Sequence, residues 1–316
     1  MTLIILFPII ILIFSYIYDI FLGEPPLKIH PVVILGKIID FTSIYFRKIS
    51  QKRIAGLLFL LFIIILYVIP SAILFLIFRL NNPYAILIYL LISIYILKST
   101  FSVKSMHDHI LKIIHALELN NIDMARRSTS LVVRRSTENM TPGLISSAAI
   151  ETIAEGFVDG YLTPIFFYSF TGLAGALACR AINTMDSMVA YKDKKNIKFG
   201  YFTALADTII NYIPARLSCI IFFISSMILG YKSKFRTGIN STDSVNAGFS
   251  INSMAGILNV RLEKVGEYII NESGREPNIN DIKRALKIYY LSSLISLVFA
   301  CIIIYILYLA GIVLII

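Results

Sequence analysis

Long runs of apolar residues constrain this chain more than any other feature of its sequence. The runs at residues 1–22, 54–78 and 288–316 exceed the roughly 18 residues that cross a bilayer as a helix. A shorter run at 84–97 follows 54–78 across a tight turn, which predicts a helical hairpin. Together these four segments predict an all-α, polytopic helical membrane protein.

Two further apolar stretches, residues 161–182 and 206–230, are rich in Gly, Pro and polar residues, such as Gly172 and Pro214. Backbone breaks and ionisable groups at membrane depth are tolerated where they line a protein-enclosed cavity. We therefore expect broken or re-entrant helices around a polar site. The sequence leaves open whether this pair crosses, so the predicted number of crossings is four or six.

The charge distribution predicts which segments lie in the cytoplasm. The chain has a net charge of +10, and its basic residues lie in loops that flank the apolar runs, as in cytoplasmic loops of membrane proteins. This pattern argues for a lipid bilayer as the partner and against nucleic acid. We expect one integral membrane domain over residues 1–316 in the cell membrane, with a basic loop after residue 22, a cytoplasmic helical insertion at 98–160 and a cytoplasmic loop region at 231–287.

Three carboxylates stand at a spacing that points to chemistry. Glu151, Glu155 and Asp159 are four residues apart, which on a helix places them on one face. Like charges this close repel, and such a row persists most easily with a cation on it. Magnesium suits oxygen ligands and is usually bound together with substrate phosphates. The alternative is the solvated face of an amphipathic helix.

Two amide–carboxylate pairs border the interrupted apolar stretches. Asn183 and Asp186 are three residues apart, and Asp207 and Asn211 are four apart. Alone, each pair could cap a helix or shape a turn. Arg216 is more informative, because a guanidinium near membrane depth needs an anionic partner, which here would be Asp207 or a ligand phosphate.

The remaining polar motifs are weaker by themselves. Asn246 lies in a small-residue stretch that leads to Arg261 and Lys264, but a P-loop pattern is absent and a plain loop is the simpler interpretation. His30 precedes Pro31 in a rigid polar turn. The three cysteines are scattered, without disulfide or zinc-site spacing.

In this order, the motifs resemble the CobD/CbiB membrane proteins of cobalamin biosynthesis, the adenosylcobinamide-phosphate synthases. The likeness spans nearly the whole chain. The matching pieces are Gly23-Glu-Pro-Pro with His30-Pro-Val, Glu151-Thr-Ile-Ala-Glu155 with Asp159-Gly, Asn183-Thr-Met-Asp186, Asp207-Thr-Ile-Ile-Asn211 with Pro214-Ala-Arg216, Asn246-Ala-Gly248, and Arg261-Leu-Glu-Lys264.

The resemblance implies ATP-dependent formation of an amide between the free propionate of adenosylcobyric acid and aminopropanol or its phosphate, with Mg²⁺ as cofactor. The implied metal ligands are Glu151, Glu155, Asp159, Asp186 and Asp207. The implied catalytic residues are Glu151, Glu155, Asp186, Asp207 and Arg216. Substrate or nucleotide contacts are expected from His30, Asn183, Asn211, Asn246, Arg261 and Lys264.

Three positions depart from the family pattern, and each lacks a polar or acidic group found in relatives. They are Ser136, Gly156 and Ala206. A membrane transporter or a non-catalytic corrinoid-binding membrane protein is the alternative function. Homo-oligomerisation and association with other cobalamin biosynthesis enzymes are possible further interactions that the sequence leaves open.

Overall fold

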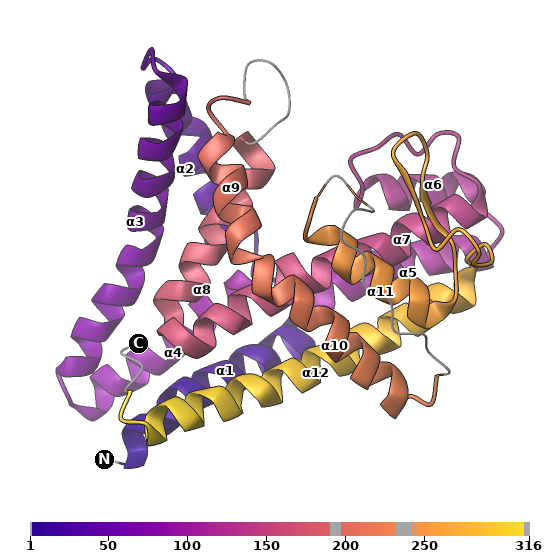
Figure 1. Cartoon of the computed structure of the whole chain (residues 1–316). Helices are drawn as coiled ribbons and strands as arrows, with labels where there is room; N and C mark the ends of the chain where they lie inside the picture. Colours follow the sequence, from indigo (N-terminus) through magenta and orange to yellow (C-terminus); the bar gives the residue numbers. More distant parts are fainter. Residues whose placement is uncertain (1, 190–196, 232–241, 243, 313–316) are drawn as a thin grey trace. The chain divides into compact units, whose positions relative to one another are not determined.

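The structure is a computed structural model that describes residues 2–189, 197–231, 242 and 244–312. Its backbone is almost entirely helical (Figure 1), which confirms the predicted all-α class. The elements are α1 (Thr2–Leu22), α2 (Pro31–Phe46), α3 (Lys52–Arg79), α4 (Pro83–Thr100), α5 (Lys104–Glu118), α6 (Ile122–Ser130), α7 (Pro142–Phe157), the π-helix η1 (Val158–Leu162), α8 (Thr163–Val189), α9 (Tyr201–Ile210), α10 (Tyr212–Ile228), α11 (Ala247–Leu258), β1 (Leu262–Lys264), β2 (Tyr268–Ile270) and α12 (Ile279–Leu309).

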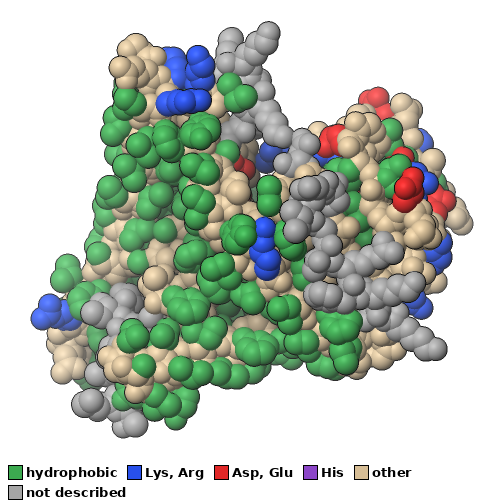
Figure 2. Space-filling view, in the orientation of Figure 1, with side chains coloured by type: hydrophobic (Ala, Val, Ile, Leu, Met, Phe, Trp, Pro, Cys, Tyr) green, Lys and Arg blue, Asp and Glu red, His purple; other side chains and the backbone are tan. Residues whose placement is uncertain are grey.

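Five helical segments among the described residues are long and apolar enough to cross a membrane. They are Lys52–Arg79, Pro83–Glu118, Pro142–Val189, Tyr201–Ile228 and Ile279–Leu309, and two shorter apolar helices are Phe7–Leu22 and Ala247–Leu258. Figure 2 shows hydrophobic side chains over the face of α3, whereas charged side chains gather near α6. These features support a multi-pass membrane protein.

The chain divides into two compact units. The first comprises Met1–Ser102, Thr163–Ile210 and Leu297–Ile316, and the second comprises Val103–Leu162 and Asn211–Ser296. The second unit therefore contains most of the predicted insertion 98–160 and all of the region 231–287. The cytoplasmic placement of both regions stays a prediction.

In the first unit, α3 packs against α4, α8 and α9, and α2 packs against α8. The rings of Phe59 and Phe199 stack with centroids 5.6 Å apart. Gly56 permits this contact, because a Cβ there would collide with the Phe199 carbonyl.

The prediction of a loop after residue 22 was wrong for residues 31–46, which form α2. The helix begins at Pro31, and the His30 side chain accepts a hydrogen bond from the Val32 amide as its cap.

The apolar stretches expected to be interrupted are interrupted. Gly172 has φ 64° and ψ −153°, a conformation that breaks α8 and that glycine adopts readily. The second stretch is divided into α9, which ends at Ile210, and α10, which begins at Tyr212. The prediction of broken helices is thereby confirmed.

In the second unit, α7 packs against α5, α6, α11 and β1. Strands β1 and β2 form an antiparallel hairpin in which Lys264 pairs with Tyr268. The turn contains Gly266 at φ 79°, a left-handed conformation that favours glycine. The region predicted as a loop at 231–287 thus contains α11, this hairpin and the start of α12. The small-residue stretch at Asn246, which was interpreted as a plain loop, leads directly into the helix α11. The small Ala, Gly and Ser residues of this helix are mostly buried.

Candidate active site

A polar pocket in the second unit collects charged side chains of both signs, and we call it the charged pocket. Its volume is about 460 Å³, within the range of roughly 300–1,000 Å³ typical of small-molecule sites. The connection from α6 to α7, the helix α7 and the β1–β2 hairpin form its walls. The lining residues are Val132, Val133, Arg134, Arg135, Ala148, Glu151, Thr152, Glu155, Lys264, Glu267 and Tyr268.

Glu151 is the most firmly held carboxylate of the charged pocket. Glu151 is only 6% exposed to solvent. One oxygen, Oε1, accepts a hydrogen bond from the Ser147 hydroxyl at 2.9 Å. The other, Oε2, accepts from Arg135 Nη2 at 3.1 Å and from the Tyr268 hydroxyl at 3.2 Å. A buried charge needs such partners, so these three donors fix the carboxylate in one position.

Tyr268 is a protonated donor in this arrangement. Burial raises the pKa of the Tyr268 phenol far above its usual range, and the nearby carboxylates of Glu151 and Glu155 raise it further. The hairpin register places Lys264 beside this ring, with Nζ 5.8 Å from the ring centroid. Lys264 also pairs with Glu267 at 2.5 Å. The hairpin thus supplies both a neutral donor and a cation.

Glu155 lies one helical turn after Glu151 and is half-buried. Within the described part of the chain, no hydrogen bond or ion pair holds its side chain. It interacts electrostatically with Lys264, Arg135 and Arg134, as well as with the like charge of Glu151. Of the two carboxylates, Glu155 is therefore the one available to a ligand.

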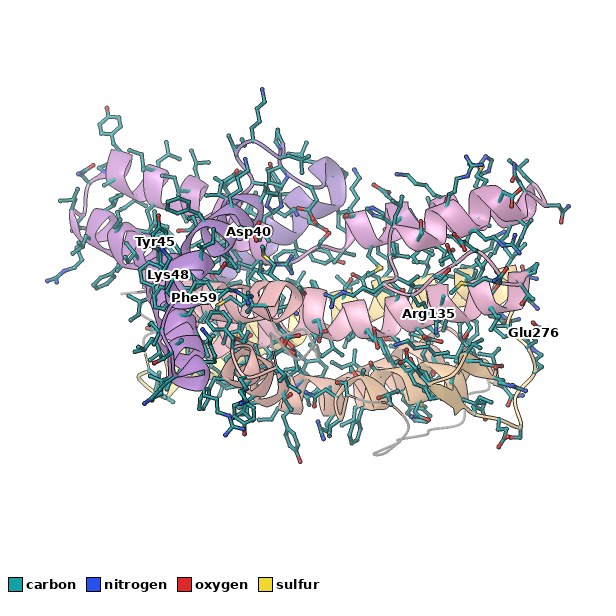
Figure 3. The ribbon with its side chains drawn as sticks, turned by 90° about the horizontal axis from the view of Figure 1, so that it is seen from above. Asp40, Tyr45, Lys48, Phe59, Arg135 and Glu276 are labelled. Atoms are coloured by element: carbon teal, nitrogen blue, oxygen red, sulfur yellow. The ribbon has the colours of Figure 1, made fainter. Side chains whose placement is uncertain are left out.

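Arg135 has donor capacity left over. Its Nη2 binds Glu151, but Nη1 is buried and has no hydrogen-bond partner among the residues that the structure describes. An unsatisfied buried donor costs about 1–3 kcal/mol. Figure 3 shows Arg135 beside α7. Unused cationic donors next to carboxylates are typical of sites for anionic ligands.

No group of three or more His, Cys, Asp or Glu residues poised to hold a metal ion occurs in the described ranges. Of the five predicted metal ligands, Glu151 and Glu155 line the charged pocket. Asp159 lies in η1 and does not line it, and Asp186 and Asp207 belong to the first unit. The pair Glu151 and Glu155 still fits magnesium, which commonly takes one or two carboxylates together with substrate phosphates.

Within the second unit, Arg216 contacts two aromatic rings and an amide. Its guanidinium lies 3.6 Å from the centroid of the Tyr212 ring and 4.1 Å from that of Phe249. Its Nη1 donates to Asn246 Oδ1 at 2.7 Å. Aromatic faces attract a guanidinium, and Nη1 also donates to the Tyr212 carbonyl at 2.9 Å. That Arg216 binds an anion stays a prediction. The structure brings Arg216 and Asn246 together, and neither lines the charged pocket. Asn211 is buried at the start of α10.

The other predicted site residues of the first unit lie on two packed helices. Asn183 and Asp186 are half-buried on α8, and Asp207 is half-buried on α9. Helices α8 and α9 contact each other. That these three residues share a site with Glu151 stays a prediction.

His30 belongs to a chain of polar contacts that we call the ion-pair network, in which Glu24 is exposed and Lys98 and Asp19 are buried. His30 Nε2 lies 2.9 Å from Glu24 Oε2, which is 2.8 Å from Lys98 Nζ. Lys98 Nζ is in turn 2.9 Å from Asp19 Oδ1, and the side chains of Lys98 and Asp19 are completely buried. Burial alone would raise the pKa of Glu24, but the hydrogen bond from His30 and the positive charge and hydrogen bond of Lys98 outweigh burial and lower the pKa to about 2. The network ties the turn before α2 to the end of α4.

Sequence reasoning did not select several of these residues as site or network members. Arg134, Arg135 and Tyr268 of the charged pocket had no motif of their own. Lys98 carried one signal, because a charge at the end of an apolar run needs a partner. Its partners, Asp19 and Glu24, are more than 70 positions away and could not be chosen from the sequence.

Gly156, one of the departures from the family pattern, has a local explanation. A Cβ at this position would collide with the terminal methyl group of Met106 from α5. The methionine side chain therefore occupies the space that a larger residue at 156 would need. The structure offers no comparable account of Ser136 or Ala206.

The long apolar helices and the charged pocket define a polytopic helical membrane protein with a candidate catalytic or binding site. Comparison of sequences then places it more closely. The chain belongs to the CobD/CbiB protein family, whose profile matches residues 12–298. It therefore has a role in cobalamin biosynthesis, as the sequence motifs predicted.

Relatives that cover nearly the whole chain support this membership. The chain is 49% identical to the "Probable cobalamin biosynthesis protein CobD" of Thermoplasma volcanium over 90% of this chain and 93% of the relative. It is 37% identical to the protein of the same description from Pyrococcus abyssi, over 92% and 96%. The "Cobalamin biosynthesis protein CobD" of Leptospira interrogans is 35% identical, over 90% and 94%. No solved structure matches the chain.

Proposed function

We propose that this protein is an ATP-dependent amide ligase of the cell membrane that joins aminopropanol phosphate, or aminopropanol, to the propionate of adenosylcobyric acid. The observation that carries the proposal is the charged pocket, in which Glu151 and Glu155 lie with Arg134, Arg135 and Lys264. Membership of a cobalamin biosynthesis family supports the pathway. The chemistry of the pocket supports the reaction type.

A carboxylate does not react readily with an amine, so one of its oxygens must become part of a better leaving group. In the proposed reaction a propionate oxygen attacks the γ-phosphorus of ATP, which forms an acyl phosphate and releases ADP. The amine nitrogen then attacks the acyl carbon, loses a proton and expels inorganic phosphate. Carboxylate, ammonium and ATP thus give amide, ADP, phosphate and a proton.

The side chains of the pocket suit the transfer of a phosphoryl group. Such transfers are catalysed chiefly by positioning and by cations around the transferring group. Arg134, Arg135 and Lys264 would hold phosphate oxygens, and the Nη1 donor of Arg135 is available for one of them. Ser147 and Tyr268 keep Glu151 in place while these cations bind the ligand.

Magnesium would be held by Glu155 and Glu151 together with phosphate oxygens, and when bound it would neutralise charge on the triphosphate. Glu155 is the better placed of the two, because no side chain in the described ranges occupies its oxygens. Asp186, Asp207 and Arg216 remain candidates for contacts with the corrinoid or the nucleotide.

The test is an assay of detergent-purified protein with ATP, magnesium, adenosylcobyric acid and aminopropanol phosphate. The expected result is an amide product with equimolar ADP. Glu155→Gln should lower the rate strongly, and Asp207→Asn tests the first unit. The exposed pair Lys283 and Glu118 offers a control, since Lys283→Gln should leave the rate unchanged. If the wild-type protein forms no amide, the proposed function is wrong; if both variants match its rate, only the residue assignment is wrong.

A further inference from the structure

A second polar pocket lies directly beside the charged pocket, and we call it the mixed-charge pocket. Its volume is about 240 Å³. It is lined by the start of α7, including Gly143 and Ser147, and by Arg261, Glu263 and Glu276 from the segments around the hairpin. Figure 3 shows Glu276 near the N-terminal end of α7, and Arg135 lies closer to the middle of this helix.

Ser147 lines the mixed-charge pocket and contacts Glu151, which lines the charged pocket. The Ser147 hydroxyl accepts a hydrogen bond from the Glu263 amide at 2.7 Å and donates to Glu151 at 2.9 Å. Along α7, residues 143, 147, 151 and 155 are spaced by four, which places them on one face. The hairpin lies along the same face and contributes Glu263 to one pocket and Lys264 to the other. A ligand in each pocket would therefore meet its neighbour across Ser147.

The mixed-charge pocket offers binding groups for both an anion and a cation. Arg261 pairs with Glu263 at 2.6 Å through Nη2 alone. Its Nε has no hydrogen-bond partner among the described residues. Because a guanidinium has five N–H donors, donors remain for a ligand. Glu276 also lines the pocket, and its exposed carboxylate lies so close to Gly143 that any side chain at position 143 would collide with it.

We propose that the mixed-charge pocket binds the amine substrate as a small zwitterion, with its phosphate on Arg261 and its ammonium group on the carboxylates of Glu276 and Glu263. This proposal rests on the proposed function and assigns one of its two substrates to a place. A pocket of about 240 Å³ is below the roughly 300–1,000 Å³ usual for larger ligands, so a nucleotide or corrinoid would not fit it. The charged pocket next to it would then supply the activated carboxyl.

Steady-state kinetics with two amines separate the roles of the lining residues. Arg261→Gln should raise KM for aminopropanol phosphate at least about tenfold while KM for ATP and for unphosphorylated aminopropanol stays within about twofold. Glu276→Gln should raise KM for both amines, because both carry the ammonium group. The matched control is Arg127→Gln on the exposed surface of α6, which should change none of these constants.

A direct binding measurement tests the assignment of the mixed-charge pocket separately from the proposed ligase activity. Calorimetric titration of the wild-type protein with aminopropanol phosphate, without ATP, should show binding that Arg261→Gln weakens and Arg261→Lys partly restores. If the wild type makes no amide but binds the amine in this way, the ligase assignment fails and the pocket assignment stands. The pocket assignment is overturned if Arg261→Gln leaves amine binding and KM unchanged, or if it raises KM for ATP instead.

Discussion

The ion-pair network of the first unit and the charged pocket of the second unit use similar side chains for different purposes. In the network, Lys98 lies between Asp19 and Glu24, and Glu24 also contacts His30, so the charges satisfy one another. In the pocket, Arg135 Nη1 has no hydrogen-bond partner among the described residues, and no described residue forms a hydrogen bond with the Glu155 side chain. Charges that neutralise each other hold helices together, whereas charges that face a cavity with unused bonding capacity can bind a ligand.

The largest effect is expected from breaking the network at its centre. Lys98→Met removes the cation between two carboxylates, one of them completely buried, and breaking a buried ion pair in this way costs about 3–5 kcal/mol. The measurement is the unfolding free energy in detergent. The double variant Lys98→Met with Asp19→Asn should recover part of the loss. The exposed pair of Lys283 and Glu118 is the control, and Lys283→Met should cost no more than about 1 kcal/mol.

In the charged pocket, we expect a substitution to lower the reaction rate and to leave the stability nearly unchanged. Glu155→Gln should lower the rate of amide formation by about 10²-fold, since losing one preorganised electrostatic contact typically has an effect of this size. Its unfolding free energy should change by less than about 0.5 kcal/mol, because no described side chain depends on Glu155 for a hydrogen bond. If Glu155→Gln instead destabilises the protein as strongly as Lys98→Met, the distinction between the two regions does not hold.

Acid should affect the network through Glu24. Its folded-state pKa of about 2 is below its usual 4.5, so its contribution to stability is complete above pH 4.5 and is lost as the pH falls toward 2. We expect Glu24→Gln to be less stable than the wild type at neutral pH and to lose less stability on acidification. Chemical unfolding at several pH values measures this. Parallel losses in the two proteins would contradict it.

The smallest effect is expected from a supporting donor of the charged pocket. Tyr268→Phe removes one of three hydrogen bonds to Glu151 and should cost about 1 kcal/mol of stability and less than tenfold in rate. Because the pKa of this phenol is raised, its ionisation should not appear in the pH–rate profile of the wild type below about pH 10. A loss of activity near that pH that disappears in Tyr268→Phe would show that the phenol ionises there.

Local patterns predicted the features that depend on local physics. Residue spacing placed Glu151 and Glu155 on one helical face, and Gly172 marked the interruption of an apolar helix. The loop prediction failed at α2, where Lys37 lies on an apolar helix capped by His30 and Arg47 follows the last residue of that helix. Charge alone does not distinguish a loop from an amphipathic helix end.

The partner of each charge depended on contacts between distant segments. Tyr268 reaches Glu151 only because the hairpin packs on α7, and Arg135 reaches it from the preceding connection. Arg216 lies against two aromatic rings and donates to Asn246, and the sequence indicated none of these contacts. Which groups meet is decided by packing, which sequence spacing does not report.

The sequence alone determined that this chain is a helical membrane protein of a known family, because apolar run length and ordered motifs are properties of the chain itself. Only the tertiary structure decided which carboxylates are already neutralised by neighbours and which remain open to a ligand. That difference depends on distances between side chains far apart in sequence. At those distances electrostatic and hydrogen-bond energies change steeply, so a small difference in packing separates a structural ion pair from a binding site.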